Sequence, residues 1–260
     1  VDCRFWLDDT QKGRRDFQNS HIPRAIYAHL DEDLSGPVVA GETGRHPLPP
    51  VDIFAQRLGS WGIDKDVQVV VYDDRGGAVA ARLWWMLKWM GHGAAAVLDG
   101  GWPAWLRADY PTTDELPAAQ KREFEPNLRS ELVVTAADLL AHFGDPSYRL
   151  IDSRAPERYT GEQEPIDAVG GHISGALSYP FQRNLDVEEN FIPKEFLKGR
   201  FHVLLEGTPA VKTIFYCGSG VTAAQNILAV THTGLGMPRL YAGSWSDWIT
   251  DPERPITTGE

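Results

Sequence analysis

Cys217 is the residue of this sequence whose surroundings most clearly favour chemistry. It follows a short apolar stretch, Ile214-Phe-Tyr216, and precedes a turn of small residues, Gly218-Ser-Gly220. A helical pattern begins near Val221, so we expect the unpaired N–H groups of a helix start to face the sulfur. These groups and the helix dipole stabilise an anion, which favours the nucleophilic thiolate. The alternative is a buried cysteine that packs as a small apolar side chain, but that role requires no Gly-Ser-Gly turn.

The cysteine lies within an alternation of apolar strands and helical patterns. We expect strands at Val67–Tyr72, Ala95–Leu98, Leu150–Asp152, Thr213–Tyr216 and Arg239–Tyr241, and helices at Ala80–Met90 and Val221–Thr231. This alternation predicts an α/β fold with a parallel sheet that helices cover on both faces. Ligands of such sheets bind at the carboxyl ends of the strands, which is where Cys217 stands.

Four short segments of the first half recur in the second half in the same order, at offsets of 143 to 151 residues. The pairs are Val1-Asp-Cys-Arg4 with Ile151-Asp-Ser-Arg154, His21-Ile22 with His172-Ile173, Val69-Val-Val-Tyr72 with Thr213-Ile-Phe-Tyr216, and Asp99-Gly-Gly-Trp102 with Ala242-Gly-Ser-Trp245. Such repetition indicates two copies of one fold. A polar, proline-rich stretch at 110–126 reads as a linker, so we expect domains at 1–118 and 119–260.

Composition restricts the classes of function. The chain of 260 residues is 42% hydrophobic and 23% charged, and its net charge of −11 argues against binding to nucleic acid or anionic membranes. Its two cysteines form no disulfide framework, and Cys3 lies in an apolar strand, so we expect a reducing compartment, the cytoplasm. No cluster of cysteines or histidines with metal-ligand spacing is present, so we expect no metal. We expect no secretion signal within these residues. The sequence starts at Val1 inside an expected strand, so residues before it, a targeting segment among them, are compatible with this expectation.

The repeat, the Asp152-Ser-Arg154 strand end, the Gly171-His172 element and the loop Cys217-Gly-Ser-Gly-Val-Thr222 together resemble the two-domain rhodanese family of sulfurtransferases. The likeness covers essentially the whole chain and implies two tandem rhodanese-like domains, each with a central parallel sheet flanked by helices. Within the family the loop looks like the 3-mercaptopyruvate type, because thiosulfate-preferring members usually carry cationic residues after the cysteine. The resemblance also implies that the C-terminal domain is catalytic. Asp73 stands where the N-terminal domain would need a thiol, so that domain is expected to be silent.

The resemblance implies that Cys217 attacks the outer sulfur of a donor and keeps it as a persulfide. Backbone N–H groups from Gly218 and Gly220 through Val221 and Thr222 are expected to hold the negative sulfur, and the glycines let the backbone close around it. The leaving fragment is pyruvate enolate from 3-mercaptopyruvate, or sulfite from thiosulfate. A thiol or cyanide then accepts the sulfur, with a thioredoxin-like protein as one candidate acceptor. This chemistry requires no cofactor.

Ser219 is the candidate for assisting the leaving fragment. Its hydroxyl can donate a hydrogen bond to the keto oxygen of the donor or join a relay that protonates the enolate; the structural alternative is a turn serine. His21, with Asp8 or Asp9, is a candidate for completing this relay, although a lone histidine more often has a structural role. The spacing does not distinguish the two aspartates. His172 is expected to fix a turn.

A donor with a carboxylate requires a positioned arginine, because a guanidinium can bind both carboxylate oxygens. Arg158 matches the substrate arginine of the family, whereas Arg154 matches a position that is structural. The mercaptopyruvate type also tends to carry a second arginine after a Glu-Pro pair. Here Glu164-Pro165 is followed by Ile166, and Arg183 is a candidate substitute.

Three other functions compete with a mercaptopyruvate sulfurtransferase. A thiosulfate:cyanide sulfurtransferase would use the same persulfide. A cysteine phosphatase would need an arginine that closes the loop over phosphate, but no Arg or Lys follows Cys217 before Arg239. A non-catalytic sulfur carrier would not require the intact loop together with Arg158.

Overall fold

The computed structural model describes residues 1–259, which form two units. Unit 1 contains Val1–Gly36, Leu48–Arg129 and Val187–Asn190, and unit 2 contains Pro37–Pro47, Ser130–Asp186 and the chain from Phe191 onward. Residues 37–47 and 187–190 therefore each belong to the unit built mainly from the other half of the chain, and we call them the crossing segments. The main boundary between the two units lies after Arg129, whereas the sequence suggested a domain boundary after residue 118.

The later boundary has a simple cause, because the expected linker is attached to unit 1. Arg122 N donates a hydrogen bond to Gly59 O at 2.9 Å, and Asn127 N donates to Met90 O at 2.9 Å. Arg122 also forms an ion pair with Asp64 at 2.6 Å.

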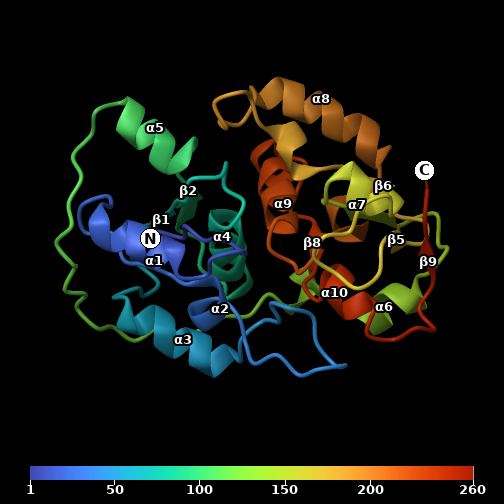
Figure 1. Ribbon diagram of the computed structural model, residues 1–260, viewed down its shortest axis with the longest axis horizontal. Helices are drawn as coiled ribbons and strands as arrows, with labels where there is room; N and C mark the ends of the chain where they lie inside the picture. Colours follow the sequence, from blue (N-terminus) through green and yellow to red (C-terminus); the bar gives the residue numbers. More distant parts are fainter. Residues whose placement is uncertain (260) are drawn as a thin grey trace. The chain divides into compact units, whose positions relative to one another are not determined.

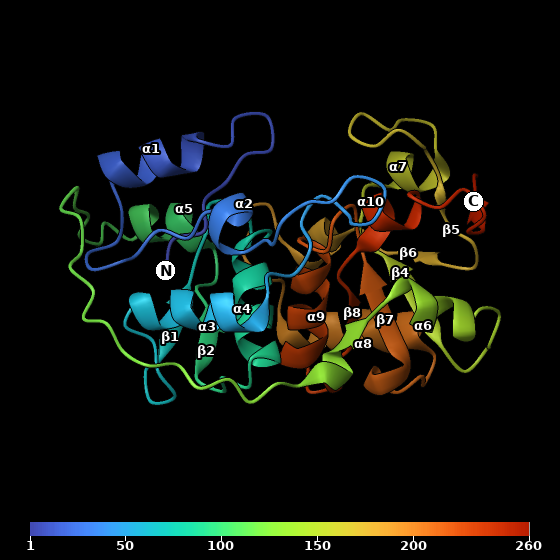
Figure 2. The ribbon, with the colours of Figure 1, turned by 90° about the horizontal axis from the view of Figure 1, so that it is seen from below.

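Unit 2 is built on a five-stranded parallel sheet with the strand order β3-β8-β7-β4-β6. Its strands are β3 (Val133–Val134), β4 (Arg149–Asp152), β6 (Leu177–Ser178), β7 (Thr213–Tyr216) and β8 (Arg239–Tyr241). The central strand β7 is buried at every position, which is typical of a strand covered on both faces. The predicted parallel sheet is confirmed, and the carboxyl ends of β4, β7 and β8 lie at one edge (Figure 2).

Helices cover both faces of this sheet (Figure 1). α8 (Lys194–Leu205) and α9 (Ala223–His232) lie on one face, and α6 (Ala136–Ala141) and α10 (Ser244–Trp248) lie on the other. Side chains alternate along β7, so Ile214 and Tyr216 pack in a cluster with the tryptophans of α10. The remaining elements are α7 (Pro156–Thr160), the antiparallel pair β5 (His172–Ile173) and β9 (Ile256–Thr257), and the short turns η1 (Ser130–Leu132), η2 (Phe181–Asn184) and η3 (Ala210–Lys212).

Unit 1 follows the same plan with fewer regular strands. β1 (Val69–Val71) and β2 (Ala95–Val97) are parallel, and Asp2 forms parallel bridges to both Tyr72 and Tyr27, so four chain segments lie side by side. Its helices are α1 (Lys12–Asn19), α2 (Leu30–Asp33), α3 (Val51–Ser60), α4 (Ala80–Trp89) and α5 (Gly101–Arg107). Within residues 1–259, no helix is both long enough and apolar enough to cross a membrane.

Candidate active site around Cys217

Cys217 begins the loop that joins β7 to α9, and the first residues of α10 hold this loop in place. Cys217 N donates to Ser244 Oγ at 3.1 Å, while Trp245 N and Ser246 N donate to the carbonyls of Cys217 and Gly218 at 3.0 and 2.9 Å. Gly220 has a φ of +74°, and a Cβ atom there would lie 2.2 Å from the carbonyl oxygen of Ala242. Only glycine fits such a position, so sequence and neighbours together determine the shape of the loop.

The backbone amides of this loop are available to a ligand. In the described part of the chain, the N–H groups of Gly218, Ser219, Val221 and Thr222 donate no hydrogen bond to the protein. Cys217 is only 2% exposed. Amides without a protein acceptor, close in sequence to a buried sulfur, can hold the negative charge of a thiolate or a persulfide.

Unit 1 contains the matching loop, with Asp73 at the position of Cys217. Trp102 N donates to the Asp73 carbonyl at 2.8 Å, as Trp245 N does to the Cys217 carbonyl at 3.0 Å. Like the cysteine, Asp73 is buried. The repeat seen in the sequence is therefore also a repeat of main-chain contacts.

The loop of unit 1 holds an anion that belongs to the protein itself. The Asp73 carboxylate accepts hydrogen bonds from four backbone amides at 2.8 to 2.9 Å, those of Arg75, Gly77, Val79 and Ala80. Counted from Asp73 and Cys217, the amides of Arg75 and Gly77 correspond to those of Ser219 and Val221, which have no protein acceptor. The unit 1 loop therefore binds a buried carboxylate through its backbone, and the matching amides of Ser219 and Val221 in unit 2 can hold an anion in the same way.

Ser219 lies beside a histidine from a distant part of the sequence. Nδ1 of His46 is 2.7 Å from Oγ of Ser219, and both side chains are buried. His46 is part of the crossing segment 37–47, which belongs to unit 2. According to the tautomer, either the ring N–H donates to the hydroxyl oxygen or the hydroxyl donates to the ring nitrogen. Such a pair can move a proton to or from a neighbouring reactant.

His21, which the sequence suggested for this role, has a structural environment instead. Its ring stacks on Phe17 with 3.9 Å between ring centroids, and its nitrogens contact the carbonyl oxygens of Phe17 and Glu115 at 2.6 and 3.2 Å. His172 repeats this arrangement in unit 2, where it stacks on Tyr159 and its Nδ1 lies 2.9 Å from the Tyr159 carbonyl. His21 is thus the counterpart of a turn-fixing histidine.

The expected pairing of His21 with Asp8 or Asp9 needs correction. Both aspartates are exposed, and Asp9 forms an ion pair with Arg15 at 2.5 Å. Because both nitrogens of His21 already face carbonyl oxygens, the ring has no free nitrogen for a carboxylate. The histidine beside Ser219 is His46.

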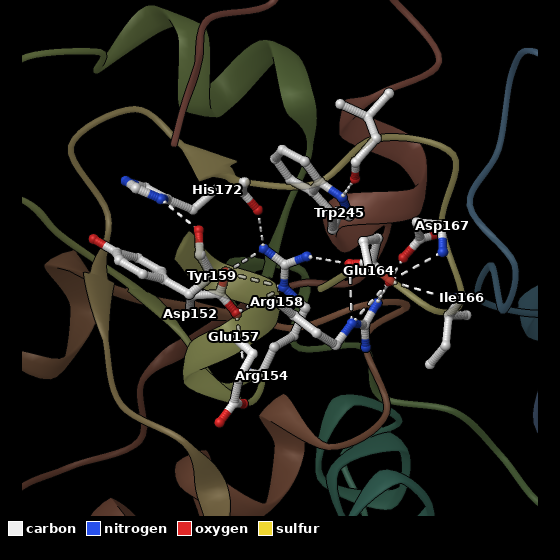
Figure 3. A network of polar contacts seen from close by, with 12 residues as sticks. Asp152, Arg154, Glu157, Arg158, Tyr159, Glu164, Ile166, Asp167, His172 and Trp245 are labelled. Atoms are coloured by element: carbon white, nitrogen blue, oxygen red, sulfur yellow. Dashed lines mark hydrogen bonds and ion pairs between the residues drawn. The ribbon is translucent and has the colours of Figure 1, made fainter. Parts of the chain in front are cut away.

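Arg158 belongs to a network of ion pairs in unit 2 (Figure 3). Its Nε donates to both oxygens of Glu164 at 3.0 Å, and its Nη2 contacts Asp167 at 2.8 Å. Burial alone would raise the pKa of Glu164, but the hydrogen bond and charge of Arg158, together with backbone hydrogen bonds, outweigh burial and lower the pKa. Burial raises the pKa of Asp167, against the pull of Arg45 and Arg158.

Arg154, by contrast, is engaged in buried contacts. It binds both oxygens of Asp152, donates to the Gly171 carbonyl at 2.5 Å, and lies over the ring of Trp245 at 4.7 Å. Arg4 and Asp2 repeat this bidentate pair in unit 1. The arginine therefore joins a strand end to the rest of its unit.

A second arginine accompanies Arg158 next to the loop, and sequence reasoning missed it. A Cβ atom on Gly218 would lie 2.9 Å from Nη2 of Arg45 and 3.4 Å from both terminal nitrogens of Arg158. Arg45 also forms an ion pair with Asp167. Arg183, the suggested substitute, is exposed and lies over the ring of Tyr179 at 4.9 Å.

The missed residues share one origin. Arg45 and His46 are neighbours in a segment without strand or helix periodicity, so nothing in the repeat pointed to them. The available signal was a glycine- and proline-flanked Arg-His pair, because loops often carry the polar groups of a site.

Known proteins resemble this chain along its whole length. The model of the rhodanese-like domain matches residues 1–108 and 135–251. A probable 3-mercaptopyruvate sulfurtransferase of Pseudomonas aeruginosa is 48% identical over all of this chain and 92% of its own length. The thiosulfate sulfurtransferase of Rattus norvegicus is 33% identical over all of this chain and 88% of its own. The solved structure of 3-mercaptopyruvate sulfurtransferase from Leishmania major superimposes with a TM-score of 0.82 at 31% identity, covering 95% of this chain and 68% of that one. The chain therefore belongs to the family of two-domain rhodanese-like sulfurtransferases.

Proposed function

We propose that this sulfurtransferase takes its sulfur from 3-mercaptopyruvate and carries it as a persulfide on Cys217. The observation that supports this donor best is the contact of 2.7 Å between His46 Nδ1 and Ser219 Oγ in the loop of the cysteine. A mercaptopyruvate donor leaves as a carbanion equivalent that needs a proton, whereas sulfite needs no proton on carbon. A proton relay in the loop therefore favours mercaptopyruvate over thiosulfate.

The first half-reaction forms one sulfur–sulfur bond and breaks one carbon–sulfur bond. The Cys217 thiolate attacks the sulfur of 3-mercaptopyruvate, and the electron pair of the broken bond passes to the carbon as pyruvate enolate. The amides of Ser219 and Val221 hold the sulfur anion before and after this step, as the corresponding amides hold Asp73 in unit 1. Gly218 and Gly220 give the loop its close approach, and Thr222 ends it before α9.

The enolate then becomes pyruvate by gaining a proton at the methylene carbon. The donor loses its thiol proton as the persulfide anion forms, so the relay only moves a proton from sulfur to carbon. Ser219 is the group placed to deliver it, and His46 is the positioning partner that restores the hydroxyl hydrogen. Arg158 binds the donor carboxylate through the Nη1 group that its ion pairs leave unused.

In the second half-reaction a thiolate or cyanide attacks the outer sulfur and releases the Cys217 thiolate. Cyanide becomes thiocyanate, and a thiol becomes a persulfide. We place the enzyme in a reducing compartment, the cytoplasm, where a thioredoxin-like dithiol can act as acceptor, because thiols stay reduced there. Unit 1 takes no part in the chemistry, since its loop carries a carboxylate instead of a thiol.

Steady-state kinetics with both donors test this proposal. We expect a higher kcat/KM with 3-mercaptopyruvate than with thiosulfate, with cyanide and with a dithiol as acceptor. A higher kcat/KM with thiosulfate would overturn the donor assignment while leaving the persulfide chemistry in place.

A further inference from the structure

We infer that Arg45 is the second donor-binding arginine of this site, in place of the guanidinium that Ile166 does not supply. The inference rests on the proposed function, because it concerns the carboxylate of the same donor. Preference for a donor that carries a carboxylate would then depend partly on a residue from the first half of the chain.

The backbone of Arg45 is fixed against the element that holds the cysteine loop. Arg45 N donates to Ser246 Oγ at 3.0 Å, and Ser246 N in turn donates to the Gly218 carbonyl at 2.9 Å. The preceding residue, Gly44, packs so closely that a Cβ atom would lie 2.5 Å from the Gly243 carbonyl oxygen. Arg45 and the loop therefore share one anchor, α10.

Asp167 joins the two guanidiniums. Its carboxylate pairs with Nη1 of Arg45 through one oxygen and with Nη2 of Arg158 at 2.8 Å through the other. The Asp167 side chain is only 4% exposed. A buried carboxylate with an arginine on each oxygen holds both arginines at one place, which limits the entropy lost when a ligand binds them.

Each of the two guanidiniums has a terminal nitrogen near the loop that these ion pairs leave unused. In residues 1–259, neither Nη2 of Arg45 nor Nη1 of Arg158 donates a hydrogen bond to the protein, and a Cβ atom on Gly218 would contact both. The Nε of Arg45 is buried and also has no partner. Two guanidiniums thus present free N–H groups beside the residue that follows Cys217, as required for a carboxylate attached to the reacting sulfur compound.

Position 166 explains why this arginine is needed. Ile166 occupies the place after Glu164-Pro165 where the mercaptopyruvate type tends to have arginine, and its side chain is 43% exposed. Its backbone N–H donates to Glu164 Oε1 at 3.1 Å, so position 166 adjoins the network of Arg158 (Figure 3). An arginine introduced there has room to extend, which makes Ile166→Arg a test of replacement.

The decisive experiment compares 3-mercaptopyruvate with mercaptoacetone, which has the same thiol and keto groups but no carboxylate. We expect Arg45→Ala to raise the KM for 3-mercaptopyruvate by roughly 10- to 100-fold, the effect of one lost charged hydrogen bond, and to leave the KM for mercaptoacetone unchanged. Arg183→Ala is the matched control, since it removes an exposed arginine of the same unit, and both KM values should stay at the wild-type level. The double variant Arg45→Ala/Ile166→Arg should recover part of the lost affinity for 3-mercaptopyruvate.

The possible results separate this inference from the proposed function. If the wild-type enzyme does not use 3-mercaptopyruvate, the proposed function fails. If it does and Arg45→Ala changes the KM values for both donors equally, or changes neither, then Arg45 does not bind the carboxylate and the inference is overturned.

Discussion

Four side chains of unit 2 divide the chemical work at the scale of single residues. In the proposed mechanism Cys217 carries the sulfur and Ser219 with His46 moves a proton, while Arg158 has free guanidinium hydrogens beside the loop. The histidines show how context decides a role. His21 faces two carbonyl oxygens and is held by stacking, whereas His46 faces the Ser219 hydroxyl in the loop of Cys217.

Cys217→Ser should abolish persulfide formation, because a hydroxyl does not form the sulfur–sulfur bond. Mass spectrometry after incubation with 3-mercaptopyruvate should show a gain of one sulfur atom in the wild type and none in the variant. Cys3→Ala is the control for a buried thiol of unit 1 and should still take up sulfur. Sulfur transfer that persists in Cys217→Ser would exclude Cys217 as the nucleophile.

His46→Gln should lower kcat with 3-mercaptopyruvate by about 100-fold, since general acid–base catalysis by one side chain is worth about that much. With thiosulfate kcat should stay unchanged, because sulfite leaves without protonation on carbon. His21→Gln should behave in the opposite way and lower the Tm while kcat remains, because it removes a stacked ring. Equal losses with both donors in His46→Gln would argue against a relay.

At the scale of elements, the two strand-to-helix loops share one backbone arrangement but begin with different residues, Asp73 in unit 1 and Cys217 in unit 2. In each loop the N–H of a tryptophan donates to the carbonyl of the first loop residue. In unit 1 further backbone amides donate to the Asp73 carboxylate, whereas in unit 2 the amides of Ser219 and Val221 have no protein acceptor.

The sequence predicted these elements well. β7 and β8 have the predicted ends, while α9 starts at Ala223 instead of Val221, because Val221 and Thr222 belong to the loop. Periodicity identifies strands and helices but contains no signal for where a turn passes into a helix.

The loop of unit 1 also predicts a dependence of stability on pH. Burial, and next the charge of Asp73, raise the pKa of Asp74 from 3.8 to about 7, and its Oδ1 is buried without a partner. The folded state therefore binds this proton more tightly than the unfolded chain. Its stabilising effect is complete below about pH 4 and is lost as the pH rises toward 7.

Asp74→Asn removes this titration. The Tm of the variant should exceed that of the wild type at pH 8, and the difference should shrink or vanish at pH 4. Asp66→Asn is a suitable control, because the Asp66 side chain is 72% exposed. A shift of equal size at both pH values would show that the charge of Asp74 does not cost stability.

At the scale of the whole molecule, the crossing segment 37–47 carries residues from the first half of the chain to the loop of Cys217. It brings Arg45 and His46 into the unit of Cys217. The repeat and the family resemblance predicted two α/β domains and the cysteine loop, because strands, helices and turn glycines leave periodic or local marks. They did not predict this segment, because contacts between residues about 170 positions apart leave no local pattern.

Gly44→Ala tests whether the position of Arg45 and His46 depends on the close packing of segment 37–47 against residues 243–246. A Cβ atom would approach the backbone of Gly243 and the Ser246 hydroxyl, so Arg45 and His46 must shift together. We expect both a higher KM and a lower kcat with 3-mercaptopyruvate, measured in the same assay. Gly199→Ala, at a position of α8 with nothing within 4 Å, should leave both constants unchanged. Wild-type kinetics in Gly44→Ala would mean that the segment tolerates displacement.

The reach of residues 37–47 into the second unit has a consequence for ancestry. Gene duplication first produces two interchangeable copies, and either can decay or be replaced. If Arg45 and His46 act as proposed, recombination can no longer exchange one copy alone without removing them from the unit of Cys217. Both copies would then be inherited together, although the loop of unit 1 carries a carboxylate where unit 2 has the Cys217 thiol.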